Sequence, residues 1–285
     1  MAESPRQGHG RGRLAESDRP AGEPGILHPS DAMQHFDHQR HSPDERLSPF
    51  VLNLWTVVWD LRDRDPFTAQ VLPYPSVNLS VTNTEADVTG VTRRRYNRHL
   101  AGRGYVVGAR FRPGCFRPFL NGPVAGLTDQ HRPISEVLGR ATDVLQRAVA
   151  ATSDRDEWVE LLTSFLLQDL PPRDPRAEDI ALLVDEIAAR TDLVRVEQVA
   201  ELAQVGVRRL QRLFADYVGA APKWVIMRCR LQDAAARAGS DDVQDWAALA
   251  VELGFSDQAH LTRAFSQTIG TPPAAYAARA KFGGT

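Results

Sequence analysis

Residues 210–222 read LQRLFADYVGAAP, and residues 261–273 read LTRAFSQTIGTPP. Five residue types recur between the two stretches at a constant offset of 51 residues: Leu (210 and 261), Arg (212 and 263), Phe (214 and 265), Gly (219 and 270) and Pro (222 and 273). Self-similarity at a fixed offset is the signature of a repeated supersecondary unit. The sequence therefore predicts two copies of one unit in the C-terminal part of the chain.

Each copy has the pattern of a helix-turn-helix. A short amphipathic segment, VEQVAELAQVG at 196–206 and DWAALAVELGF at 245–255, precedes a tight turn and then the aligned helix. The turn before the second copy is one residue longer. Both copies together predict an all-helical domain built from two helix-turn-helix units.

The aligned helices have two faces with different chemistry. At 100° per residue, large apolar residues such as Leu210 and Phe214 share the side that packs on the core. Small or hydrogen-bonding residues occupy the opposite side, and in a major groove such side chains can pair with base edges. An exposed polar face is often only solvated, but its duplication in matching phase favours base reading. These residues are Arg208, Gln211, Arg212 and Ala215 in the first copy, and Ala259, Thr262, Arg263 and Ser266 in the second.

Charge is concentrated in one part of this region. The whole chain has a formal net charge of -2, which gives no global attraction to nucleic acid. Residues 206–230, however, contain six basic side chains and one acid, Asp216. A local basic patch is what phosphate contact requires. The predicted phosphate contacts are Arg209, Lys223, Arg228 and Ser266.

The segment between the copies predicts a connecting helix. Residues 223–238 contain no Gly or Pro, and at 1.5 Å per residue they would form a helix of about 24 Å. Successive major-groove faces on one side of DNA are about 34 Å apart. We therefore expect one chain to place both helices in adjacent grooves of an asymmetric site.

Two stretches resemble the DNA-binding domain of the AraC/XylS family of transcription regulators: LAVELGFSDQAHLTRAFSQTIGTPPAAY (249–276) and VAELAQVGVRRLQRLFADYVGAAPKWVIMRCRL (199–231). The resemblance spans about 178–280 and includes the Gly-Phe-Ser turn and the terminal Gly-x-x-Pro. It implies that both second helices of the units read bases. The base-reading residues that it implies are Arg208, Gln211, Arg212, Gln258, Ala259, Thr262 and Arg263.

The first half of the chain differs in composition. Residues 1–23 are poor in large apolar groups and are predicted to be a disordered tail. FVLNLWTVVW, SVNLSVTN, ADVTGV and YVVGARF predict strands, and two helical patterns follow before PPRDPR breaks the chain. The predicted fold is an α+β domain, β-rich with two C-terminal helices, over 24–170, then a linker at 171–177 and the all-α domain at 178–285. The N-terminal half resembles a sensor-type domain fused to this DNA-binding domain in actinobacterial-type proteins, and no ligand follows from that resemblance.

Arginines are frequent between Val88 and Thr128, where eight occur without an acid. One interpretation is an anion or effector site at Arg110, Arg112 and Arg117, with the first two pointing to one side of a strand. The other interpretation is scattered surface arginines in an arginine-rich sequence.

An enzyme is not predicted, and no catalytic set, metal site or cofactor motif has supporting context. Among the alternatives, Cys115 near Arg117 could serve a DNA-repair or alkylation-sensing protein, although an inert thiol is favoured. The four histidines between His28 and His41 fit no compact metal site. A helical interaction module that does not bind DNA is a further alternative.

The expected partner is double-stranded promoter or operator DNA. RNA polymerase, a second copy of the chain and a small-molecule effector are candidate further partners, and no membrane is expected. No apolar run approaches the roughly 18 residues that a transmembrane helix needs. Two distant cysteines favour a reducing compartment. The expected location is therefore cytoplasmic, and nucleoid-associated when DNA is bound.

Overall fold

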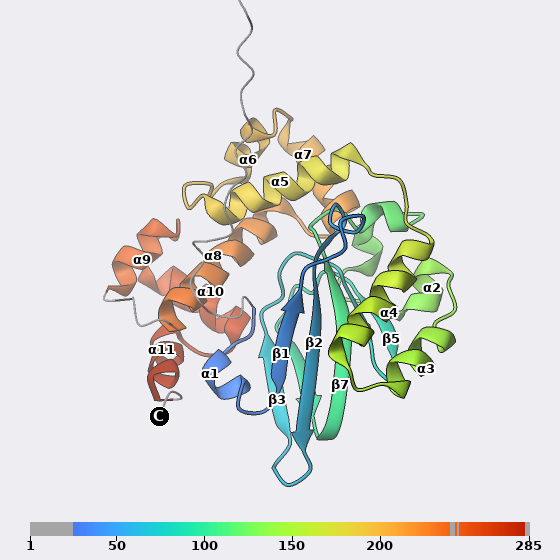
Figure 1. The fold of residues 1–285 in the computed structure, drawn as a ribbon. Helices are drawn as coiled ribbons and strands as arrows, with labels where there is room; N and C mark the ends of the chain where they lie inside the picture. The colour runs from blue at the N-terminus through green and yellow to red at the C-terminus, as the bar shows by residue number, and fades with distance from the viewer. Residues whose placement is uncertain (1–24, 240–242, 244, 283–285) are drawn as a thin grey trace, which may run out of the picture.

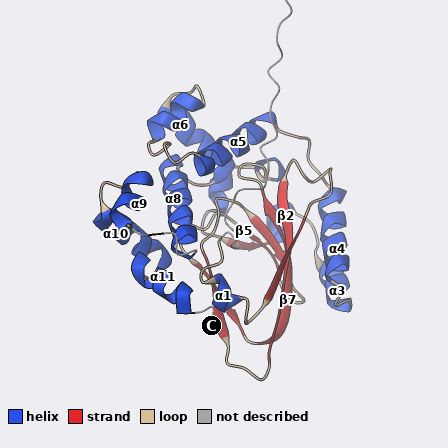
Figure 2. Cartoon of the chain, turned by 60° about the vertical axis from the view of Figure 1, so that its left-hand side comes forward, coloured by secondary structure: helices blue, strands red, loops and turns tan. Residues whose placement is uncertain are grey.

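A computed structural model describes residues 25–239, 243 and 245–282. An antiparallel sheet lies between two sets of helices (Figure 1). The helices α3 and α4 lie on one side of the sheet, whereas α8, α10 and α11 lie on the other side (Figure 2). The predicted disordered tail, residues 1–23, falls outside the described residues. The α+β half followed by an all-α half confirms the predicted fold class.

The N-terminal half contains a six-stranded antiparallel sheet in the order β1-β2-β7-β4-β5-β8. The four runs predicted as strands form β2, β4, β5 and β7, because their alternating β-branched and aromatic residues suit a sheet with buried faces. A separate two-stranded sheet pairs β3 with β6, and a short helix α1 precedes β1. The bounds are α1 Pro29–Ala32, β1 Asp37–His41, β2 Val51–Leu61, β3 Phe67–Val71, β4 Asn78–Val81, β5 Ala86–Thr89, β6 Tyr96–Leu100, β7 Gly102–Phe111 and β8 His131–Pro133.

Three helices rather than two cover one face of this sheet: α2 Ile134–Leu138, α3 Asp143–Ala151 and α4 Arg155–Gln168. The first predicted helical pattern is divided because Gly139 has a φ of 66°, a left-handed conformation that ends α2. Trp158 of α4 is buried in the core with Leu54 and Val107 of the sheet. Its ring stacks on Tyr105 with 4.5 Å between centroids.

The C-terminal half is entirely helical in the described residues. Two short 3-10 helices, η1 Arg117–Phe119 and η2 Val124–Leu127, lie in the N-terminal half and contact it. The predicted connecting helix is α8, 18 residues long, which confirms the helical pattern at 223–238. The bounds are α5 Pro175–Ala189, α6 Val196–Leu202, α7 Val207–Leu213, the π-helical turn η3 Phe214–Val218, α8 Pro222–Gly239, α9 Trp246–Glu252, α10 Gln258–Ile269 and α11 Pro273–Phe282.

The helical half has two apolar cores, one for each copy of the unit. The first contains Leu210 and Phe214, and the second contains Leu261 and Phe265, so the repeated Leu and Phe serve the same purpose in both copies. Residues of the N-terminal half complete both cores: Val91 and Cys115 in the first, and Leu27 and Leu72 in the second. The two halves therefore share buried surface.

The predicted linker lies close to the start of α5. Asp174 caps this helix by accepting a hydrogen bond from the backbone N–H of Arg176, and Pro175 occupies the first helical position. The last three residues of the predicted linker thus form the first turn of α5. No helix in the described part of the chain is both long and apolar enough to cross a bilayer.

Candidate nucleic-acid interface

The first helix of interest runs from Val207 through α7 and the π-helical turn to Val218, and we call it the first reading helix. Gly206 provides the N-cap position without a side-chain hydrogen bond. Leu210 and Phe214 are fully buried, which fixes the rotation of the helix about its axis. The opposite side faces solvent, and its exposed residues are those predicted from the sequence: Arg208, Gln211, Arg212 and Ala215.

The second reading helix is α10. Its length equals that of the first reading helix, which consists of α7 and η3. Asp257 caps it, because its Oδ1 accepts from the backbone N–H of His260 at 2.7 Å. That hydrogen bond lowers the pKa of the Asp257 carboxyl. Leu261 and Phe265 are buried. Among the predicted reading residues, Gln258, Ala259 and Arg263 are exposed to solvent, whereas Thr262 and Ser266 are half-buried.

Three arginines of the two reading helices have no carboxylate within ion-pair distance in the described residues, although the charge of Arg263 helps to lower the pKa of Asp257. Within residues 25–239 and 245–282, the guanidinium groups of Arg208, Arg212 and Arg263 make no hydrogen bond or ion pair. Most other arginines in the described chain are engaged with carboxylates or carbonyls, as Arg237 is with Glu252 at 2.8 Å. Donors that are exposed and unpaired remain available for guanine O6 and N7, or for phosphate oxygens.

The predicted phosphate contacts divide into two groups. Arg209 and Lys223 are exposed, and Ser266 is half-buried. The prediction for Arg228 is wrong, because this side chain is 2% exposed. Its Nη2 donates to the carbonyl oxygen of Arg93 at 2.6 Å, and its guanidinium lies 4.7 Å from the centroid of the Trp224 ring. Burial lowers the pKa of Arg228 to about 10, so it remains charged at neutral pH but faces the protein instead of solvent.

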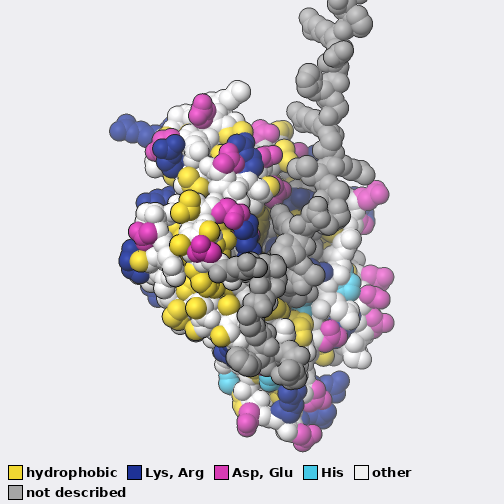
Figure 3. Space-filling view, turned by 90° about the vertical axis from the view of Figure 1, so that its left-hand side faces the viewer, with side chains coloured by type: hydrophobic (Ala, Val, Ile, Leu, Met, Phe, Trp, Pro, Cys, Tyr) yellow, Lys and Arg dark blue, Asp and Glu magenta, His cyan; other side chains and the backbone are white. Residues whose placement is uncertain are grey.

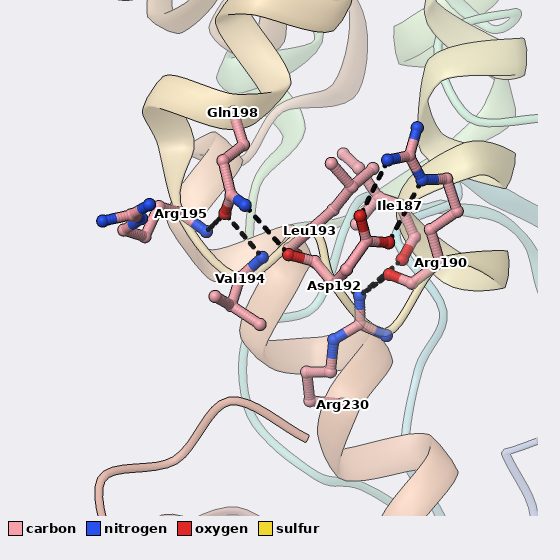
Figure 4. A network of polar contacts seen from close by, with 8 residues as sticks. All are labelled: Ile187, Arg190, Asp192, Leu193, Val194, Arg195, Gln198 and Arg230. Carbon is pink, nitrogen blue, oxygen red and sulfur yellow. Dashed lines mark hydrogen bonds and ion pairs between the residues drawn. The ribbon is translucent and has the colours of Figure 1, made fainter. Parts of the chain in front are cut away.

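Arg230 is a second buried arginine of α8, at 2% exposed. One of its guanidinium nitrogens donates to the carbonyl oxygen of Ile187 in the last turn of α5 and to those of Arg190 and Leu193, which follow the helix (Figure 4). A cation at that end is favoured by the helix dipole. Gln198 lies nearby and accepts from the backbone N–H groups that precede α6 (Figure 4). Arg230 thus positions the first unit on α8.

Fewer basic side chains are therefore exposed in this region than the sequence predicted. Two of its six basic residues, Arg228 and Arg230, are buried. Its single acid, Asp216, pairs with Arg117 of the N-terminal half. On the side that carries α9 and α10, acidic and basic side chains are intermingled, and basic ones lie both at the left edge and at the lower end (Figure 3). The basic side chains of the patch that stay exposed are therefore Arg208, Arg209, Arg212 and Lys223.

Arg112 and Arg117, two of the three predicted effector arginines, are held by different parts of the protein. β7 ends at Phe111, so Arg112 lies beyond the strand, and its Nε donates to the carbonyl oxygen of Ser48 at 2.8 Å. Arg117 Nε lies 2.7 Å from Asp216 Oδ1. Only Arg110 belongs to the sheet, where it is paired in register with Asn53 and Asn78. Arg112 therefore lies one residue past the strand that carries Arg110, and the expectation that both side chains point to one side stays a prediction.

Cys115 lacks the features of a reactive thiol. It is 1% exposed, and its Sγ lies 3.7 Å from the carbonyl oxygen of Ala177. Burial raises the pKa of the thiol to about 12. Arg117, the expected source of stabilisation for a thiolate, is paired with Asp216 instead.

The sequence did not indicate the contacts between the two halves of the chain. Arg95 Nη1 donates to the carbonyl oxygen of Ile269, and Thr128 Oγ1 donates to the carbonyl oxygen of Gly219, each at 2.5 Å. The run of arginines in the N-terminal half was a visible signal, but it did not show which carbonyls they contact.

Two family models match parts of the chain, and several solved structures are similar to it. Residues 199–279 match the helix-turn-helix domain family, and residues 39–133 match a domain of unknown function, DUF6597. Among solved structures, an AraC-type transcriptional regulator from Chromobacterium violaceum is 21% identical, with a TM-score of 0.31, over 37% of this chain and 92% of that chain.

ToxT from Vibrio cholerae is also similar. An apo structure of a lysine-to-alanine variant of ToxT is 12% identical, with a TM-score of 0.40, over 79% of this chain and 97% of that chain. A ToxT structure described as bound to an unsaturated fatty acid is 11% identical, with a TM-score of 0.35, over 85% and 95% of the two chains. The chain therefore joins an N-terminal segment that matches DUF6597 to a C-terminal segment that matches the helix-turn-helix domain family.

Proposed function

We propose that this protein is a sequence-specific DNA-binding regulator of transcription that reads an asymmetric site with both reading helices. Its helix-turn-helix domain and fold point to DNA-binding regulation and not to an enzyme. The observation that carries the proposal is that Arg212 and Arg263, at the same position of the two copies, are exposed and make no hydrogen bond or ion pair within the described chain. The duplication of this exposed arginine at the same position of both units is what favours base reading over a solvated surface.

We assign base reading to the exposed or half-buried side chains of both helices. Bidentate pairing of an arginine with guanine contributes about 1–3 kcal/mol of discrimination. Arg209, Lys223 and Ser266 are assigned to phosphate, which positions the protein without reading sequence. The assigned base-reading residues are Arg208, Gln211, Arg212, Gln258, Ala259, Thr262 and Arg263.

We also propose that residues 24–170 modulate DNA binding, through an effector or through association of two chains. Support comes from the buried surface that they share with both units of the DNA-binding domain. Contacts with RNA polymerase belong to the same proposal.

Selection of bound duplexes from a random library by the full chain tests the central proposal. We expect an asymmetric motif with two blocks separated by about one helical turn. The matched control is Arg147→Ala, which removes an exposed arginine on α3, on the side of the sheet away from α8 and α10 (Figure 2). This variant should select the same motif. Absence of any enriched motif would contradict the proposal.

A further inference from the structure

The two reading helices end in the same way. Gly219 and Gly270 occupy equivalent positions of the repeat, and both adopt the left-handed conformation, with φ of 83° and 94°. The last carbonyl groups of a helix have no partner within it, so they need hydrogen-bond donors from outside. In both copies such a donor comes from the N-terminal half of the chain.

At the first unit, the hydroxyl of Thr128 donates to the carbonyl oxygen of Gly219 at 2.5 Å. Val124 of η2 packs on the same glycine, since a Cβ at Gly219 would lie 3.0 Å from Val124 Cγ1. Nearby, Arg117 pairs with Asp216 of the first reading helix. The end of this helix is therefore held by hydrogen bonding, packing and charge.

At the second unit, Arg95 Nη1 donates to the carbonyl oxygen of Ile269 at 2.5 Å. The guanidinium lies directly against Gly270, where a Cβ would be 2.2 Å from Arg95 Nη1. A cation at the C-terminal end of a helix also interacts favourably with the helix dipole. Arg95 therefore holds the same end of the second helix that Thr128 holds in the first.

The two contacts come from two loops of the N-terminal half that are hydrogen-bonded to one another. The backbone N–H and the Nε of Arg93 donate to the two carboxylate oxygens of Asp129, each at 2.7 Å. The backbone N–H of Asp129 donates to the carbonyl oxygen of Val91 at 3.0 Å. The carbonyl of Arg93 also accepts from the buried Arg228 of the connecting helix. We call residues 91–95 and 124–129 the clamp.

We propose that the clamp fixes the position of the two reading helices relative to one another, and that the N-terminal domain controls DNA binding by holding or releasing it. The inference rests on the proposed function for its consequence on DNA. The clamp contacts the first unit, the connecting helix and the second unit at once. A signal that moves either loop therefore changes the spacing of the two helices.

A distance measurement between the two units tests this without DNA. Glu201→Cys on α6 and Val251→Cys on α9 place spin labels on exposed positions of the two units. The native thiols of Cys115 and Cys229 are 1% and 4% exposed, so labelling is selective. The protein with an intact clamp should give one narrow distance distribution. Arg95→Ala and Thr128→Val should each broaden or shift it.

The matched control is Arg98→Ala, from the same arginine-rich segment, because Arg98 pairs only with Glu85 of its own domain in the described structure. It should leave the distribution narrow. Unchanged distributions in both clamp variants would overturn the proposal. Circular dichroism establishes whether each variant folds. If Arg95→Ala does not fold, the distance distribution of Thr128→Val alone tests the proposal.

A spacing series on DNA provides the functional readout. Inserting three base pairs between the two blocks rotates one block by about 100°, so the unsubstituted chain should lose roughly tenfold or more in affinity. The Arg95→Ala variant should lose less affinity for the same site, because its two reading helices are no longer held at a fixed spacing. An equal loss in both proteins would contradict control by the clamp. If no specific DNA site exists, the proposed function fails while the distance measurement still decides the clamp.

Discussion

Arg117 of the N-terminal half and Asp216 of the first reading helix form an ion pair, with 2.7 Å between Nε and Oδ1. Both side chains are partly exposed, at 28% and 40%. The pair occupies the one acid of the first reading helix. A carboxylate there would otherwise repel phosphate, so the N-terminal domain also influences the charge of the DNA-binding surface.

Asp216→Asn should have a small effect on stability and a larger effect on nonspecific binding. Partly exposed ion pairs contribute about 0–1 kcal/mol, so the free energy of unfolding in urea should change by no more than that. Loss of a negative charge beside the first reading helix should increase affinity for random DNA at low salt. Unchanged affinity, measured by fluorescence anisotropy, would show that Asp216 lies too far from the DNA to matter.

Lys223→Ala and Arg228→Ala should act differently, although the sequence predicted phosphate contact for both. Lys223→Ala should reduce the slope of log affinity against log salt by about one and leave stability nearly unchanged. Arg228→Ala removes the donor to the carbonyl of Arg93 and should reduce the free energy of unfolding by about 1–3 kcal/mol. Its salt slope should remain that of the unsubstituted protein. A reduced slope in Arg228→Ala would contradict its burial.

Gly270→Ala should destabilise the protein. Its φ of 94° is strained for alanine, and the new Cβ would collide with the Arg95 guanidinium. The expected loss is about 1–3 kcal/mol. Gly122→Ala is the control, because its Cβ would meet nothing within 4 Å and the backbone is unstrained. Thermal unfolding of the two variants compares them directly, and equal melting temperatures would exclude close contact at Gly270.

Cys115 should resist alkylation in the folded protein. Its thiol has a pKa raised to about 12 by burial, whereas an unfolded thiol ionises near a pKa of about 8.5. As pH rises, the unfolded state therefore releases the thiol proton first. The contribution of Cys115 to the free energy of unfolding is present below about pH 8.5 and is lost as pH rises toward 12. Reaction with a thiol reagent at about pH 8, just below the ordinary thiol pKa, should be slow until denaturant is added. Rapid reaction in the native state would revive the alkylation-sensing alternative.

The DNA-binding half could be predicted from the sequence because its signals are local. The 51-residue offset and the apolar stripe at Leu210 and Phe214 define both helices and their exposed faces within one segment. In contrast, β1, β3, β6 and β8 were not predicted, because their sequences carry no such local signal. Short polar strands such as Asp37–His41 acquire their structure from the strands beside them.

The fate of individual arginines could not be predicted, because it depends on distant residues. Arg228 donates to a carbonyl 135 residues away, and Arg95 donates to a carbonyl 174 residues away. On a helix wheel Arg228 looks like any basic residue beside a DNA-binding unit. Only the packing of one domain on the other turns it inward, and no local pattern records that packing.

The most direct test of base reading compares two variants on the selected DNA site. Every base pair of the site is substituted in turn, and affinities are measured at fixed salt for the unsubstituted chain, Arg212→Ala and Arg263→Ala. The account predicts that each variant loses about 1–3 kcal/mol of discrimination in one block only, and in a different block for each arginine. Uniform weakening at all positions, or the same block affected by both substitutions, would contradict reading by two duplicated helices.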